Sequence, residues 1–171
     1  GQGEGAYRQM RSNLTVSSDP SETTYVQCVA DYVIGALEPT QQAANRWEVT
    51  VFDSPQANAF ALPGGKIGVY TGLLDVAYNR DQLAAVLAHE VGHVLAQHGN
   101  ERASRSTLRR AGIAAARVLG ASSRTVQAID FGSQLGLQLP FDRAQESEAD
   151  AIGLMLMARA GFDPEQSVVL W

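Results

Sequence analysis

Two histidines and a glutamate lie together in the segment AHEVGH, inside the apolar run DQLAAVLAHEVGHVLAQHG. His89 and His93 are four residues apart, so on a helix both imidazoles project from one face and can converge on one ion. Glu90 follows the first histidine and can point to a position beside that ion. In such an HExxH arrangement the histidines bind zinc, and the carboxylate takes a proton from the water that zinc activates. It then passes the proton to the leaving amine.

The alternative is a buried helix whose histidines bond to the backbone and whose glutamate pairs with an arginine. An unpaired buried carboxylate costs several kcal/mol, so the apolar surroundings favour a partner charge. Gly92 also favours the zinc site over the alternative. A glycine inside a helix costs about 1 kcal/mol relative to alanine and is useful where another backbone approaches closely. We therefore expect one zinc ion (Zn2+) per chain.

Catalytic zinc needs a third protein ligand and an open fourth position. A metzincin would continue the motif with a glycine at position 96 and a histidine at position 99, whereas this chain has Ala96 and Gly99, so that class is excluded. His98 lies five residues after His93, about 140° further round a helix, and cannot reach the same ion. The third ligand must come from a different helix.

The segment RAQESEADAIG contains a candidate for that ligand. Glu146 and Asp150 are four residues apart on one helical face, and Ala149 and Gly153 leave room for a neighbouring helix. We assign Glu146 as the third ligand, and we expect Asp150 to accept the free ring N–H of a liganding histidine and fix its tautomer. Glu148 falls on the far side. Without the HExxH motif, these glutamates would be interpreted as an ordinary solvated helix face.

The remaining sequence predicts the elements that position these groups. A helix is expected from Asp19 as N-cap and Pro20 to the break at Pro39. Three short strands are expected near residues 48–52, 57–61 and 66–70, since this region is rich in β-branched and aromatic residues and is broken by Pro-Gly turns. The metal-binding helix is expected to begin at Asn79 or Asp81, to end at Gly99 and to be buried on all sides.

Two further regions are expected to be helical. The sequence of residues 100–140 predicts two helices, which could cover the cleft. The last full helix is predicted between Asp142 as N-cap and Gly161 as C-cap, and a short helix restarts at Asp163. Because that helix stops about two turns later, we expect the domain to be truncated at its C-terminus.

Length and composition favour a single domain over residues 1–171, since 45% of the residues are hydrophobic and no linker is visible. The predicted fold class is α+β of the zincin type, mainly helical, with a small three-stranded antiparallel sheet beside the active-site helix. A net charge of −5 and the absence of a dense basic run argue against nucleic acid as a partner. No segment reaches the ~18 apolar residues of a membrane span, so membrane association is expected only through a removed N-terminal anchor.

Three segments of the chain resemble a known family. They are NAFALPGGKIGVYTGLL, LAAVLAHEVGHVLAQH and ESEADAIGLMLMARAGFDP. The chain is similar to the HtpX-like and CAAX-prenyl-protease-like zinc metallopeptidases, in particular their bacterial periplasmic branch represented by BepA and LoiP. The resemblance implies the same site: His89, His93 and Glu146 as zinc ligands, Glu90 as general base, and Asp150 holding a ligand from outside the coordination sphere.

The resemblance also implies that one strand borders the cleft. Its residues are Asn58, Ala59, Phe60 and Ala61. A strand edge beside the zinc can pair with an extended substrate backbone and align the scissile carbonyl over the metal, which would favour unfolded chains as substrates. For any one of these residues, an ordinary sheet strand before a Pro-Gly-Gly turn remains the alternative.

The function that the resemblance implies is an endopeptidase acting on unfolded or misassembled proteins, in protein quality control at a periplasmic or outer-membrane location. Family members usually continue to a His-Pro motif that can stabilise the oxyanion, and this chain ends before it, so the oxyanion stabiliser is unassigned. One alternative is a zinc-stabilised module that binds polypeptide without cleaving it. A second alternative is a purely structural zinc site. Glu90 argues against this alternative, because a structural site needs no base.

Overall fold

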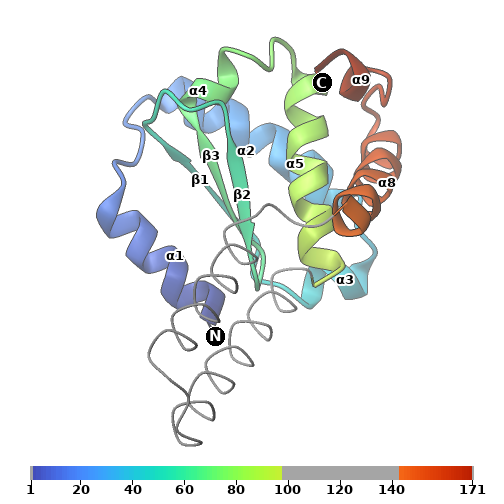
Figure 1. Ribbon diagram of the computed structural model, residues 1–171, viewed down its shortest axis with the longest axis horizontal. Coiled ribbons are helices and arrows are strands. Elements are labelled where there is room, and N and C mark those ends of the chain that lie inside the picture. Colours follow the sequence, from blue (N-terminus) through green and yellow to red (C-terminus); the bar gives the residue numbers. More distant parts are fainter. Residues whose placement is uncertain (1, 98–142, 171) are drawn as a thin grey trace, which may run out of the picture.

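The computed structural model describes residues 2–97 and 143–170 of the chain (Figure 1). The elements in chain order are α1 (Gln2–Asn13), α2 (Pro20–Gly35), α3 (Pro39–Ala43), β1 (Glu48–Phe52), β2 (Ala59–Leu62), β3 (Lys66–Tyr70), α4 (Thr71–Leu74), α5 (Arg80–Leu95), α8 (Arg143–Ala160) and α9 (Gln166–Leu170). The predicted α+β class, mainly helical with one three-stranded sheet, is confirmed. Among the described residues, no helix has the length and apolar character needed to cross a membrane.

The sheet is mixed, so the prediction of an antiparallel sheet was wrong. Its strand order is β1-β3-β2. A hairpin through Gly64 and Gly65, both at positive φ, makes β2 and β3 antiparallel. The first strand pairs with β3 instead of β2, in the register Glu48↔Lys66 to Phe52↔Tyr70. Because β2 reverses the chain between them, β1 and β3 run in the same direction.

The two faces of the sheet carry different layers. One face presents Val51, Ile67 and Val69 to the hydrophobic core, together with residues of α2 and α5. Along each strand successive side chains alternate between the faces. The opposite face presents Thr50, which accepts or donates a hydrogen bond with Tyr7 of α1. The sheet therefore lies between α1 on one side and α2 with α5 on the other, as Figure 1 shows.

The two edges of the sheet differ in their backbone pairing. Residues 15–17 run along the outer edge of β1, where the Ser17 N–H donates to the Val51 carbonyl at 2.8 Å and the Asp53 N–H donates to the Thr15 carbonyl at 2.7 Å. The other edge is the outer side of β2, which faces α5 in Figure 1. An edge strand with unpaired backbone groups is a template for adding another strand.

Helix α5 is the central buried helix that the sequence predicted. The Asn79 side chain caps it by accepting the Gln82 N–H at 2.9 Å, and ten of its residues from Gln82 to His93 are buried. The helix ends at Leu95, four residues before the predicted stop, and Gln97 has a positive φ of 58°. Gly99 itself lies outside the described residues.

Helices α8 and α9 close the other side of α5. The predicted C-cap at Gly161 is confirmed, since Gly161 has φ of 88° and the Phe162 N–H donates to the Met157 carbonyl at 2.9 Å. Helix α9 begins at Gln166 instead of Pro164, and the Asp163 N–H donates to Asp81 at the start of α5 at 3.0 Å. The predicted N-cap Asp142 and the two helices of residues 100–140 lie outside the described residues.

The sequence did not predict α1 or α3. Helix α1 is polar and contains two glycines, but Gly3, Tyr7 and Met10 follow a helical spacing and lie on its sheet-facing side. The predicted helix over 20–38 ends at Gly35, and α3 follows from Pro39 with Glu38 and Gln41 forming a capping box.

Candidate metal centre

The site begins with close packing between α5 and α8. A Cβ atom added to Gly92 would lie 2.8 Å from the Ala149 carbonyl oxygen, and one added to Gly153 would lie 3.0 Å from the His89 nitrogen. Each helix therefore presents a glycine to the backbone of the other. The sequence predicted this close approach at Gly92 and Gly153. This contact places the glutamate-bearing start of α8 beside the histidines of α5.

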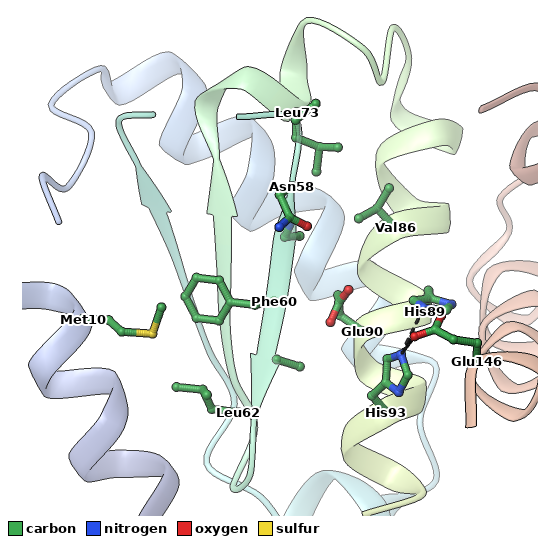
Figure 2. A pocket seen from close by; sticks show the side chains of 13 residues that line it. Met10, Asn58, Phe60, Leu62, Leu73, Val86, His89, Glu90, His93 and Glu146 are labelled. Atoms are coloured by element: carbon green, nitrogen blue, oxygen red, sulfur yellow. Dashed lines mark hydrogen bonds and ion pairs between the residues drawn. The ribbon is translucent and has the colours of Figure 1, made fainter. Parts of the chain in front are cut away.

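Three predicted ligands come together at this contact. His89 Nε2 and His93 Nε2 are 3.1 Å apart, and Glu146 places Oε2 3.0 Å from His89 Nε2 and Oε1 3.3 Å from His93 Nε2. Figure 2 shows the two imidazoles and the carboxylate converging on one point. Among residues 2–97 and 143–170, this is the one group of three or more His, Cys, Asp or Glu side chains whose ligand atoms lie close enough together to bind one metal ion.

The three ligand atoms fit a zinc ion. Ligands at about 2.0–2.1 Å in a tetrahedron are separated from each other by about 3.3–3.4 Å. The two Nε2 atoms are 3.1 Å apart, and each lies 3.0–3.3 Å from one of the two Glu146 carboxylate oxygens, so the separations are close to this size. Two neutral imidazoles and a carboxylate are also the donor set of a catalytic zinc site. The residues present therefore suit the metal that the sequence predicted.

Asp150 lies where the sequence placed it, one turn beyond Glu146. Its Oδ1 atom is 2.7 Å from Nδ1 of His89. Among the described residues no hydrogen bond of good geometry reaches the buried Nδ1, so the Asp150 oxygen lies off the N–H direction. At this separation a small rotation of the exposed Asp150 side chain would align the bond. Asp150 can thus hold the tautomer that leaves Nε2 of His89 free for the metal.

Glu90 lies beside the ligands and against the edge strand. Burial and, to a smaller extent, the nearby charge of Glu146 raise the pKa of Glu90 to about 8, against the opposing effect of a backbone hydrogen bond from Ala61. A carboxyl whose pKa lies near neutrality can both accept and return a proton in a reaction, and such shifts cluster at functional sites.

A cleft of about 400 Å³ opens over these groups. Its floor is β2 with the preceding residues, and its walls come from α1 and α5 (Figure 2). The described residues that line it are Met10, Ala57, Asn58, Ala59, Phe60, Ala61, Leu62, Leu73, Val86, His89, Glu90, His93 and Glu146. All four predicted strand residues, Asn58 to Ala61, border the cleft, although the strand itself begins at Ala59.

Five residues that line the cleft were not predicted as site residues, namely Met10, Ala57, Leu62, Leu73 and Val86. Ala57 and Leu62 directly flank the predicted segment 58–61. Val86 precedes Glu90 by one helical turn, so the helical period could have identified it. Leu73 belongs to the short helix α4, and Met10 belongs to α1, which is remote in sequence. Nothing local in the sequence indicates that Met10 borders the cleft. Glu148 is exposed and lies outside the metal-binding group, as predicted.

Comparison with known proteins gives a match to one family model, described as peptidase family M48, over residues 20–171. The match leaves α1 outside. Similar proteins include mitochondrial metalloendopeptidase OMA1 of Schizosaccharomyces pombe, 39% identical over 173 residues that cover 98% of this chain and 49% of that protein. The corresponding OMA1 of Saccharomyces cerevisiae is 40% identical over 74% of this chain and 36% of its own length.

Bacterial proteins are also similar. The beta-barrel assembly-enhancing protease of Yersinia pestis is 31% identical over 172 residues, which cover 95% of this chain and 35% of that protein. The chain thus spans between about a third and half of the length of these relatives. Each of the three carries a name that denotes a protease or an endopeptidase.

Proposed function

Because this chain belongs to peptidase family M48, we propose that it is a zinc metalloendopeptidase that cleaves unfolded or misassembled polypeptides, with Glu90 as its general base. The observation that carries the proposal is the position of Glu90. Its carboxylate lies between the three-ligand group of His89, His93 and Glu146 and the outer edge of β2, inside the cleft. A structural metal site would have no use for a further carboxyl there.

Each group has a distinct part in the proposed reaction. Zinc held by His89, His93 and Glu146 would supply a Lewis acid that polarises the scissile carbonyl and promotes ionisation of water. Glu90 accepts the proton of the attacking water and returns it to the leaving nitrogen. Asp150 keeps the His89 ring in place.

The edge of β2 positions the substrate. Among the described residues no strand pairs with its outer side, which runs along the cleft beside Glu90. Main-chain hydrogen bonds to a strand edge hold any extended segment irrespective of its sequence, so folded substrates are excluded and unfolded ones are admitted. This supports cleavage of misassembled proteins as the biological role, with a zincin-type arrangement of helix and edge strand.

The proposed setting is protein quality control in the periplasm or at the outer membrane. It is supported by similarity to bacterial proteases named for enhancing β-barrel assembly. Relatives named as mitochondrial show that similar chains also work in another compartment. The alternative of a polypeptide-binding module without cleavage gains no support from these names.

The test of the proposed activity compares wild type with Glu90→Gln. Zinc content is measured by atomic absorption, and cleavage of unfolded casein is followed by gel and mass spectrometry. We expect one zinc per chain in both proteins and cleavage by wild type alone. Equal cleavage by both proteins would refute the role of Glu90, and zinc binding without cleavage by either would favour the binding module.

The third ligand is tested separately, with a matched control on the same helix. Glu146→Ala should lower zinc content because it removes one of three protein ligands. Glu148→Ala removes a carboxylate two residues away that lies outside the group, and should leave zinc content unchanged. The reverse result would show that the ligand was assigned to the wrong glutamate.

A further inference from the structure

Helix α1 forms the wall of the cleft that faces away from the metal. We propose that Met10 of α1, with Phe60 and Leu62 of β2, forms an apolar subsite that accepts every second side chain of an extended substrate. The proposal rests on the proposed function and specifies which substrates the cleft prefers. The family match begins at residue 20, so this wall lies outside the segment shared with the family model.

Helix α1 is fixed in place by contacts at several points. Gly3 lies so close to the Pro63 carbonyl that a Cβ atom there would collide with it. Tyr7 is 2% exposed and hydrogen-bonds to Thr50 on the sheet. Arg11 pairs with a glutamate of β1 at 3.3 Å. Met10, between these anchors, is therefore held over the sheet near the edge strand.

The register of β2 determines which groups a substrate meets. The Tyr70 N–H donates to the Asn58 carbonyl at 3.0 Å, so Asn58, Phe60 and Leu62 direct their backbone groups toward β3. Ala59 and Ala61 direct theirs to the outer edge, where Ala61 bonds to Glu90. A substrate strand added to this edge pairs with the backbone of these two alanines.

The side chains of the added strand alternate between the two faces of the sheet. Residues opposite Ala59 and Ala61 point to the side of the core helices. Residues opposite Phe60 and Leu62 point to the side of α1, since side chains directly opposite in a ladder lie on the same face. Every second substrate side chain is thus directed toward Met10.

Space for such a side chain exists because Phe60 lies back over the sheet. Its ring occupies the place that a Cβ atom on Gly68 would need, and it stacks with Phe52 at a centroid distance of 6.0 Å. Figure 2 shows the side chains of Met10 on α1 and Phe60 on β2 extending toward each other. The described lining on this side is apolar, whereas the ionisable lining residues lie on α5 and α8. A large apolar side chain is the best match.

The test measures peptide binding, so it does not depend on turnover. Zinc-loaded Glu90→Gln protein is titrated with fluorescent ten-residue peptides of alanine and threonine that carry Leu or Glu at one position at a time. The same peptides are titrated against Glu90→Gln carrying Met10→Ala or Met10→Lys. Met155→Lys provides a matched control, because Met155 is 63% exposed on α8 and does not line the cleft.

We expect Leu to strengthen binding at alternate peptide positions on the protein with Met10 intact. Met10→Ala should weaken that preference, and Met10→Lys should shift it toward Glu by about tenfold at the same alternate positions only. The Met155→Lys control should bind like its parent. An unchanged position profile in Met10→Lys overturns the subsite. If binding follows the expected pattern but wild type cleaves none of the peptides or casein, the subsite stands and the proposed peptidase function fails.

Discussion

Gly92 is the residue whose enlargement should separate the metal ligands. The Cβ atom of Gly92→Ala would lie 2.8 Å from the Ala149 carbonyl oxygen and 3.1 Å from its Cα, where ordinary contacts begin at 3.4 Å. Both contacting atoms are backbone, so α8 must move by about 0.6 Å relative to α5. A metal site tolerates changes of only about 0.2 Å in its ligand distances.

The expected effect is larger on zinc binding than on folding. Overpacking costs about 1–3 kcal/mol, and replacing a helical glycine by alanine returns about 1 kcal/mol. The metal-free variant should therefore lose at most about 2 kcal/mol of unfolding free energy. Zinc affinity should fall by about 10–100-fold, the range seen when support of a metal ligand is lost.

Competition with a chromophoric chelator measures the zinc affinity, and thermal unfolding with and without zinc measures the stability. Gly35→Ala is the control, because Gly35 is also a helical residue, at the end of α2, and nothing lies within 4 Å of its added Cβ. This variant should bind zinc like wild type. If Gly92→Ala also retained wild-type affinity, the close α5–α8 contact could not be what positions Glu146.

Three other perturbations give defined outcomes. In chelator-treated protein the pKa of Glu90 is raised from 4.5 to about 8, so between these values the folded state holds a proton that the unfolded state releases. The unfolding free energy should therefore fall as the pH rises from about 5 to 8, by at most about 1.4 kcal/mol per pH unit, and Glu90→Gln should remove this slope in denaturant titrations. Asp150→Asn should weaken zinc binding by about 10–100-fold, because the 2.7 Å contact with Nδ1 of His89 loses its charge; chelator competition showing no change would contradict its role. Gly68→Ala should push the Phe60 ring from its place and cost about 1–3 kcal/mol of stability, while raising KM for casein more than it lowers kcat; an unchanged KM would show that the ring stays clear of the substrate.

The metal-binding group was predictable because its signals are local. His89 and His93 share a helical face by their spacing alone, and so do Glu146 and Asp150. The two faces were also predicted to meet, since glycines at positions where helix formers are preferred indicate close backbone contact. The roles assigned to these residues remain predictions that the variants above test.

The sheet order was not predictable in the same way. The segment from 48 to 70 contains three strands, and its one clear turn at Gly64 and Gly65 specifies only the β2–β3 pairing. The first strand, β1, could pair with β2 or with β3. The choice depends on packing between residues distant in sequence, and the residue pattern of a strand does not indicate its partner. The prediction that residues 58–61 border the cleft did not depend on the strand order, because it came from the resemblance to a known family.

Helix α1 shows why part of the cleft was missed. Glycines and polar residues give its sequence a low helical preference, and its stability comes from Tyr7 and Gly3 packing on the sheet. In this helix tertiary contacts override a local preference.

The outer edge of β2 is already occupied by the protein's own groups. The Asn58 side chain accepts the Ala59 N–H at 2.9 Å, and Glu90 accepts the Ala61 N–H. Among the described residues the two outward N–H donors of β2 are thus engaged, so any added strand, whether a substrate or a second copy of the chain, must displace Asn58 or Glu90 before it can accept from them. This requirement disfavours strand exchange between copies and fibrillar association. Glutamine at position 90 can still accept the Ala61 N–H, whereas alanine cannot. Glu90→Ala, but not Glu90→Gln, should consequently make the protein prone to self-association.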